Sequence, residues 1–123
     1  MSRSYNGTDY TSVASMGHSF FARRGPLVFA HRGGRALAPE NTMAAFDRGL
    51  ALGADGLELD VHLSRDGEVV VHHDRTLERT TNLVGAIAER TADELACADA
   101  GYRFRQDDGF PFRGRGIGVP RLS

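Results

Sequence analysis

The sequence predicts an α/β fold. Three short apolar runs have the composition of β-strands, one helical pattern lies between the first and second runs, and another follows the third. Interleaving of helices with buried strands is typical of layered α/β domains. The chain has 123 residues, of which 41% are hydrophobic and 25% are charged, so we expect one globular domain with a modest core.

The first strand is predicted at residues 27–30. These four residues stand between Pro26 and the pair Gly33-Gly34, and a short apolar run with such bounds is typical of a strand buried on both faces. Residues 1–25 before it are rich in Ser, Thr and Gly and show no sustained period. We therefore expect a loose leader at 1–25 and a folded domain that starts at residue 26.

A helix is predicted after this strand. Asn41 or Thr42 can cap its first turn, because both side chains accept hydrogen bonds from free helical amides. For Asn41 we slightly favour this capping role over the alternative, in which Glu40 and Asn41 help to shape a site from the loop after the first strand. Gly53 follows the last position of the apolar pattern and can end the helix, since glycine adopts the left-handed conformation at low cost.

The remaining elements follow in order. Residues 57–63 alternate strictly between apolar and polar side chains, which predicts a single strand. Asp66-Gly67 has the composition of a hairpin turn that leads into another strand at 69–73. Residues 91–94 have the pattern of a capping box and predict a short helix that runs to about Ala100.

The strand at 57–63 carries the most informative side chains. Glu58, Asp60 and His62 share one of its faces. Two carboxylates ~7 Å apart along a strand repel each other and are costly to desolvate, and a divalent cation offsets both effects. Oxygen ligands favour a hard ion such as Mg²⁺ or Ca²⁺. A solvent-exposed face with ordinary surface charges is the alternative, since a half-exposed strand shows the same alternation.

Polar side chains also stand at the ends of the other two strands. His31 and Arg32 end the first strand, where a guanidinium suits phosphate oxygens, and the glycines after them leave room for a ligand. His72 and His73 end the strand at 69–73, and alternation lets only one of them face a site. Histidine transfers protons near neutral pH, so the three strands together carry groups suited to phosphoryl chemistry.

A set of short motifs runs from about Leu27 to the last residue: His31-Arg32-Gly33, Pro39-Glu40-Asn41-Thr42, Ala45-Phe46, Gly53-Ala54-Asp55, Glu58-Leu59-Asp60-Val61, Asp66-Gly67, His73-Asp74, Arg79-Thr80-Thr81, Gly85 and Pro111-Phe112-Arg113-Gly114. In this order the motifs resemble those of the glycerophosphodiester phosphodiesterases. Several short motifs in the family order are far more specific than any one of them.

The resemblance implies a TIM (β/α)₈ barrel. Such a barrel needs ~250 residues, so residues 26–123 would be its N-terminal portion, truncated before the barrel closes. The implied cofactor is a divalent metal, Mg²⁺ or Ca²⁺. The implied substrate is a small glycerophosphodiester, which is cleaved to sn-glycerol 3-phosphate and an alcohol. The implied site residues are the acid and base His31 and His73, the phosphate ligand Arg32, and the metal ligands Glu58 and Asp60.

Two other interpretations stay open. The family's further acidic metal ligand lies beyond this chain, so we expect little activity from the chain alone, and a non-catalytic fragment or partner-binding remnant is an alternative. A sphingomyelinase D-like phospholipase shares the two histidines and the Glu-x-Asp pattern and is the other alternative. It offers no obvious reason for the Pro-Glu-Asn-Thr segment at 39–42.

Composition excludes several classes of function. The net charge of -1 gives no general attraction to nucleic acid, so we expect no nucleic-acid partner. Cys97 is the single cysteine, which excludes an intrachain disulfide and leads us to expect a buried thiol. No apolar run approaches the ~18 residues of a membrane span, so no transmembrane segment is expected. Residues 1–24 lack a signal-peptide core, and a cytoplasmic location is expected.

Overall fold

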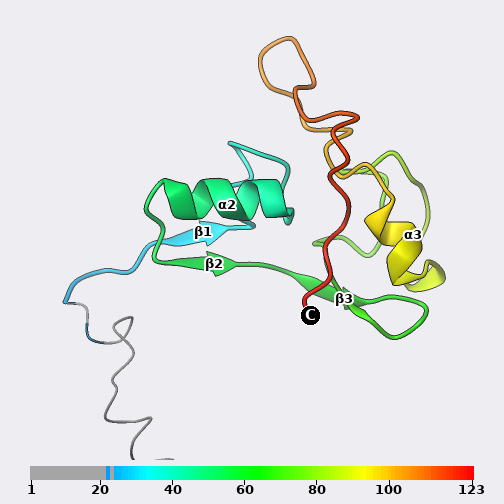
Figure 1. The fold of residues 1–123 in the computed structure, drawn as a ribbon, viewed down its shortest axis with the longest axis horizontal. Helices are drawn as coiled ribbons and strands as arrows, with labels where there is room; N and C mark the ends of the chain where they lie inside the picture. The colour runs from blue at the N-terminus through cyan, green and yellow to red at the C-terminus, as the bar shows by residue number, and fades with distance from the viewer. Residues whose placement is uncertain (1–21, 23) are drawn as a thin grey trace, which may run out of the picture.

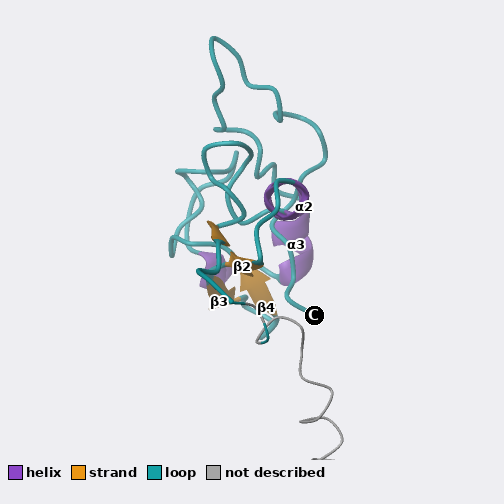
Figure 2. Cartoon of the chain, turned by 90° about the vertical axis from the view of Figure 1, so that its left-hand side faces the viewer, coloured by secondary structure: helices purple, strands orange, loops and turns teal. Residues whose placement is uncertain are grey.

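The computed structural model describes residue 22 and residues 24–123, so most of the leader predicted at 1–25 lies outside the described residues. The described part is an α/β arrangement with two small sheets, each of two strands (Figure 1). Loops make up most of the remaining chain (Figure 2). No closed barrel forms within the described residues.

A β-α-β unit forms the first half of the described chain. β1 (Phe29–His31) and β2 (Gly56–Glu58) pair in parallel, and helix α2 (Met43–Ala51) connects them and packs on their sheet (Figure 1). The packing is close, because a Cβ atom at Gly49 would stand 2.8 Å from the Cβ atom of Ala30. Parallel pairing through a crossover helix brings the carboxyl ends of both strands to one edge of the sheet.

Helix α2 is capped by Thr42. The Thr42 hydroxyl accepts a hydrogen bond from the amide of Ala45 at 3.3 Å, so our preference for Asn41 as the cap is wrong. Asn41 has a φ of 55° and lies before the helix. Gly53, with a φ of 92°, follows the last helical turn at Leu52, as a glycine stop requires.

The single strand predicted at 57–63 is wrong. β3 (Val61–Leu63) pairs antiparallel with β4 (Val69–Val71), while β2 pairs with β1, and Leu59 and Asp60 between them belong to neither strand. The side-chain alternation continues, but the hydrogen-bonding partner changes from one sheet to the other. Asp60 forms the point of change, because its carbonyl oxygen accepts a hydrogen bond from the amide of His72 at 2.9 Å.

The second half has its own hydrophobic core. The predicted capping box is confirmed at the start of helix α3 (Ala92–Ala96): the Thr91 hydroxyl accepts from the Glu94 amide, and the Glu94 carboxylate accepts from the Thr91 amide. A 3₁₀ turn, η1 (Ile87–Glu89), precedes the helix. The buried members of this core are Val70, Leu77, Ile87, Ala92, Leu95, Ala98, Ala100 and Val119.

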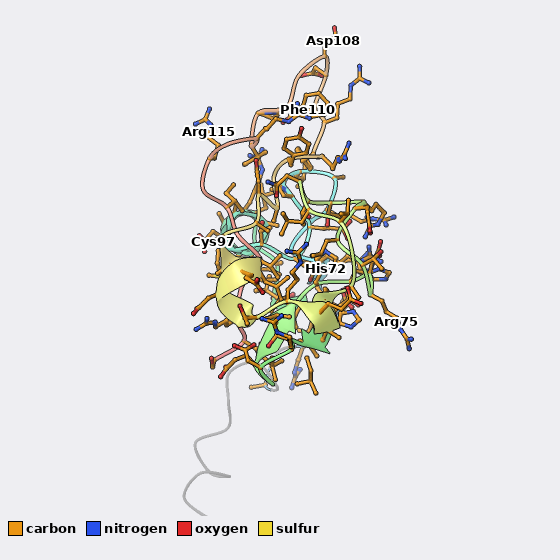
Figure 3. All side chains as sticks on the ribbon, turned by 90° about the vertical axis from the view of Figure 1, so that its right-hand side faces the viewer. His72, Arg75, Cys97, Asp108, Phe110 and Arg115 are labelled. Carbon is orange, nitrogen blue, oxygen red and sulfur yellow. The ribbon has the colours of Figure 1, made fainter. Side chains whose placement is uncertain are left out.

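Helix α3 ends at Ala96, earlier than the predicted end near Ala100. The next residue, Cys97, is exposed, so the expectation of a buried thiol is also wrong (Figure 3). The cause is the rotation of the helix, since α3 turns Ala92 and Leu95 toward the core and leaves Cys97 on the outer side.

The apolar residues of the first half are far less buried. Val28 is 59% exposed, Phe29 51% and Leu63 62%, although residues 27–30 were predicted to be buried on both faces. That prediction fails because only one face of β1 and β2 is covered, by α2. Among the described residues, no helix has the length and apolar character that crossing a bilayer requires.

Candidate active site

The turn after β1 holds Arg32 against the second strand. Arg32, Gly33 and Gly34 have φ angles of 54°, 81° and 98°. The Arg32 amide donates to the carbonyl oxygen of Glu58 at 2.9 Å and lies 3.2 Å from Glu58 Oε2. A Cβ atom at Gly33 would stand 2.8 Å from the backbone of Ala45. The room that this glycine leaves is therefore filled by α2 and not by a ligand.

The Arg32 guanidinium lies between two carboxylates. The residue is only 9% exposed, and its Nη1 donates to Glu40 Oε1 at 3.1 Å. Its Nε lies 3.6 Å from Asp60 Oδ2 and donates no hydrogen bond to any described residue. A buried donor without an acceptor is costly. An anion bound at this guanidinium would supply the acceptor, which fits the expected phosphate ligand.

His31 and Glu58 lie opposite each other on β1 and β2. His31 Nε2 is 3.7 Å from Glu58 Oε2, and both side chains are about half exposed. This position lets the imidazole reach a bound molecule at the edge of the sheet. It also places His31 beside one expected metal ligand.

Asn41 holds the other expected metal ligand. Its Nδ2 donates to Asp60 Oδ2 at 3.0 Å, and its Oδ1 accepts from the Asp60 amide at 3.4 Å. Asn41 is buried, so these two bonds fix the carboxylate of Asp60 from the protein side. The role that we assigned to Asn41 at the helix start is replaced by a role at the site.

His73 stands at the end of β4 and is oriented by Asp74. His73 Nδ1 lies 2.6 Å from Asp74 Oδ1, which leaves Nε2 as the nitrogen available to a bound molecule. Arg79 donates to both oxygens of Asp74, at 2.7 and 2.9 Å. These two bonds, with the hydrogen bond from His73, hold the pKa of Asp74 far below its ordinary value, although burial opposes them.

Glu40 joins the two halves of the site. It accepts from Arg79 at 2.6 and 3.0 Å and from Arg32 at 3.1 Å. Burial alone would raise the pKa of Glu40, but the hydrogen bonds and charges of Arg79 and Arg32 lower it overall. The pKa of Arg79 is raised, first by Glu40 and then by Asp74.

The two other histidines nearby have structural positions. His72 is buried near the centre of the molecule (Figure 3), where its Nδ1 donates to the Asp74 carbonyl and its Nε2 accepts from the Thr80 hydroxyl. Burial lowers the pKa of His72 and so favours the neutral ring. His62 Nε2 donates to the carbonyl oxygen of His73 at 2.9 Å.

A divalent metal fits Glu58 and Asp60. No group of three or more His, Cys, Asp or Glu side chains that could hold a metal ion occurs in the described part of the chain. Mg²⁺, however, is commonly bound through one or two carboxylates together with substrate phosphates and water. Both carboxylates contact Arg32, through its amide and its Nε, so the oxygen donors stand beside the expected phosphate position.

The five predicted site residues thus belong to one network of contacts. The links that complete it, Glu40, Asp74 and Arg79, were not predicted as a unit. Their motifs were visible in the sequence, as Pro-Glu-Asn-Thr, His-Asp and Arg-Thr-Thr, but Glu40 and Arg79 are 39 residues apart. Nothing in the local pattern indicated that they pair.

Comparison with known proteins gives a consistent result. A family model described as the glycerophosphoryl diester phosphodiesterase family matches residues 31–123. A glycerophosphodiester phosphodiesterase of Caldanaerobacter subterraneus is 54% identical over 78 residues, which cover 63% of this chain and 32% of that protein. The crystal structure of a glycerophosphodiester phosphodiesterase from Agrobacterium tumefaciens is 46% identical, with a TM-score of 0.71 over 80% of this chain and 40% of its own.

A third relative was solved with a reaction product. The phosphodiesterase from Oleispira antarctica, in complex with the product sn-glycerol 3-phosphate, is 38% identical and has a TM-score of 0.69 over 79% of this chain and 37% of its own. These structural relatives are TIM-barrel proteins, and this chain spans about two fifths of their length. With the family match over residues 31–123, the chain belongs to the glycerophosphoryl diester phosphodiesterase family, a family of enzymes.

Proposed function

We propose that this chain supplies the first part of the active site of a metal-dependent hydrolase that cleaves glycerophosphodiesters to sn-glycerol 3-phosphate and an alcohol. The observation that carries the proposal is the unbroken series of contacts from His31 through Glu58, Arg32, Glu40, Arg79 and Asp74 to His73. It joins the two imidazoles, the proposed phosphate ligand and the proposed metal ligand Glu58, and Asp60 lies beside it at 3.6 Å from Arg32 Nε.

Arg32 binds the phosphodiester. Its guanidinium is fixed by Glu40 and approached by Asp60, so little side-chain freedom is lost when a phosphate binds. The Nε of Arg32 donates to no described residue, so it can donate to the phosphate without breaking an existing hydrogen bond. A buried and preorganised cation stabilises the charge that develops on the phosphate oxygens.

The two histidines move the protons. One imidazole takes the proton from the attacking hydroxyl, of water or of the glycerol, as that oxygen bonds to phosphorus. The other gives a proton to the alcohol oxygen as its bond to phosphorus breaks. Where the glycerol hydroxyl attacks, a cyclic phosphate forms, and water then opens it to sn-glycerol 3-phosphate in a second step of the same kind. Asp74 fixes the tautomer of His73 through Nδ1, so that Nε2 is the working nitrogen.

Glu58 and Asp60 hold the divalent cation, Mg²⁺ or Ca²⁺. When bound there, the cation supplies positive charge against the phosphate oxygens. Asn41 keeps the Asp60 carboxylate in place. Such support of a metal ligand by a hydrogen-bonding neighbour is typical of metal sites.

A chimera tests the proposal. It consists of residues 26–123 of this chain followed by the remaining part of the Agrobacterium relative, which is 46% identical over the matched segment. We expect the chimera to release sn-glycerol 3-phosphate from glycerophosphocholine when Mg²⁺ or Ca²⁺ is present, and to stop when EDTA removes the metal. Sphingomyelin serves as the second substrate, and preference for it would favour the sphingomyelinase D-like alternative.

Single substitutions in the chimera test the residue roles. Loss of one acid or base group lowers rates by roughly 10²–10⁴-fold, so we expect this loss of kcat from His31→Ala and from His73→Ala. Arg75→Gln is the matched control, because the Arg75 side chain is exposed at the surface (Figure 3). Full activity in either histidine variant would refute the acid and base assignment.

A further inference from the structure

A polar cavity lies beside the proposed site. Its volume is about 250 Å³, and Glu40 and Arg79 form part of its wall. The same two residues join the phosphate side of the site to His73. Three more arginines line the cavity, Arg35, Arg103 and Arg105.

These arginines bring positive charge that the cavity does not neutralise. Arg35 is exposed and makes no hydrogen bond or ion pair with any described residue. Arg103 contacts the ring of Tyr102, at 5.2 Å from its centroid, and no carboxylate. Arg105 reaches Asp108 only at 3.9 Å, and both of these side chains are exposed. Opposite charges so far apart in water attract each other weakly.

Glu40 does not offset this charge. Its Oε1 accepts from Arg32 and Arg79, and its Oε2 accepts from Arg79 again. Both oxygens of this carboxylate are therefore occupied by two guanidinium groups. An anion that enters the cavity meets a surplus of cations.

Glu40, which forms part of the cavity wall, also binds the proposed phosphate ligand Arg32. Arg32 Nη1 and Arg79 Nη2 donate to the same oxygen, Glu40 Oε1, at 3.1 and 2.6 Å. A phosphodiester bound at Arg32 would therefore be separated from the cavity by one side chain, the carboxylate of Glu40. Phe104, which packs edge-on against Phe112 with ring centroids 5.3 Å apart, gives the cavity an apolar wall.

We infer that this cavity binds a second phosphate group, carried on the alcohol part of the glycerophosphodiester substrate. Guanidinium groups bind phosphate oxygens through paired, charge-assisted hydrogen bonds. A cationic alcohol such as choline is disfavoured by the same arginines. The inference rests on the proposed function, because it takes the phosphodiester to lie at Arg32, and it names the class of alcohol that the site prefers.

Two ligands that differ by one group test the inference on the 123-residue chain. Glycerophosphoglycerol has a neutral alcohol, and its derivative with a terminal phosphate on that alcohol adds the proposed anion. Dissociation constants are measured by calorimetry at pH 7.5, where the terminal phosphate is close to its dianionic form. We expect the terminal phosphate to tighten binding by about tenfold or more, the usual effect of a charge-assisted hydrogen bond.

Two variants test whether the tighter binding of the terminal phosphate comes from this cavity. Arg35→Gln and Arg103→Gln each remove one cavity cation, and neither residue belongs to the proposed catalytic site. We expect each to lower the affinity ratio of the two ligands at least threefold and to leave glycerophosphoglycerol binding unchanged. Arg115→Gln is the control, since Arg115 is exposed, points outward (Figure 3) and does not line the cavity. Circular dichroism of each variant verifies the fold.

Three outcomes overturn the inference. The first is equal affinity of the wild-type chain for both ligands. The second is an affinity ratio that stays unchanged in both cavity variants. The third is binding of inorganic phosphate alone as tight as that of the terminal-phosphate diester, which would make the cavity a site for free anions. Binding is measured without turnover, so failure of the proposed function is separate. If the chimera hydrolyses neither diester while the affinity ratio persists, the catalytic proposal fails and the phosphate site stands.

Discussion

At the scale of single residues, Arg79 has the largest influence on the geometry of the proposed site. It donates to both oxygens of Asp74 and to both oxygens of Glu40. Through Asp74 it orients His73, and through Glu40 it orients Arg32. Arg79 touches no expected reacting atom, so its role is positioning.

Loss of Arg79 should therefore lower kcat. Arg79→Ala in the chimera leaves Glu40 and Asp74 with fewer partners, and loss of a charged hydrogen bond costs about 1.5–3 kcal/mol. We expect kcat to fall by roughly tenfold to a hundredfold, and Arg79→Lys to restore part of it because one charge returns. An unchanged kcat with a raised KM would show that Arg79 only binds substrate.

Asn41 and Thr42 offer a matched pair of neighbours. Asn41→Ala removes the hydrogen bonds that fix Asp60, and loss of such support weakens metal binding by about 10–100-fold. Thr42→Ala removes the helix cap and costs about 1 kcal/mol of stability without touching Asp60. We expect the Mg²⁺ concentration for half activity to rise in the first variant and to stay constant in the second.

The reverse result, with Thr42→Ala raising the Mg²⁺ requirement and Asn41→Ala having no effect, would show that Asn41 does not support Asp60 as a metal ligand. The residue types at the site could be predicted from the strand ends, because polar groups there stand out against apolar runs. The partner of each group could not, since Glu40, Asp74 and Arg79 meet only when distant loops have folded.

At the scale of elements, most helices and strands could be predicted, but not their pairing. Alternation at 57–63 records which side of the backbone is polar, and that pattern is the same in one strand or two. The break at Leu59 and Asp60 depends on β1 and β4, which offer hydrogen bonds to different halves of the segment. A single sequence contains no local signal for that choice.

The stability of the fold should depend on pH through His72, the residue that follows β4. His72 is buried, and burial lowers its pKa below the ordinary value of 6.5, with the charges of His62 and Arg79 adding to the shift and that of Asp74 opposing it. As pH falls below about 6.5, the unfolded chain gains a proton on this ring before the folded chain does. Stability is therefore full above this pH and decreases below it.

Replacement of the His72 ring should remove its contribution to the pH dependence of stability. We expect the thermal midpoint of the chain to fall between pH 7.5 and pH 5.5, and to fall less in a His72→Gln variant, which keeps a polar side chain that does not titrate. His62→Gln is the comparison, because His62 is less buried. An equal fall in the wild-type chain and in His72→Gln would exclude His72 as the source.

At the scale of the whole molecule, burial is uneven. The side chains of Leu77, Ile87 and Leu95 are fully buried in one core, while Val28, just before β1, and Leu63, in β3, are more than half exposed. Exposed apolar residues on strands with open edges favour association with other chains. The fold class was predictable from the interleaved pattern, but the exposure was not, because an apolar run looks the same whether or not another layer covers it.

The 123-residue chain alone should accordingly associate with itself and hydrolyse glycerophosphocholine very slowly. Val28→Lys and Leu63→Lys place charge on the exposed apolar surface, so we expect size-exclusion chromatography to show less association in these variants. Lysine at Ala88, an exposed position outside that surface, is the control. Rapid turnover by a monodisperse, uncontaminated chain would contradict the expectation.

The most direct measurement is a crystal structure of the chimera with Mg²⁺ and sn-glycerol 3-phosphate. We expect the metal to contact the carboxylates of Glu58 and Asp60, and the phosphate to contact Arg32. His31 and His73 should approach the phosphate from two sides, each within hydrogen-bonding distance of its oxygens or of a water beside them. A cation or phosphate bound elsewhere, with the two imidazoles facing separate surfaces, would contradict the account.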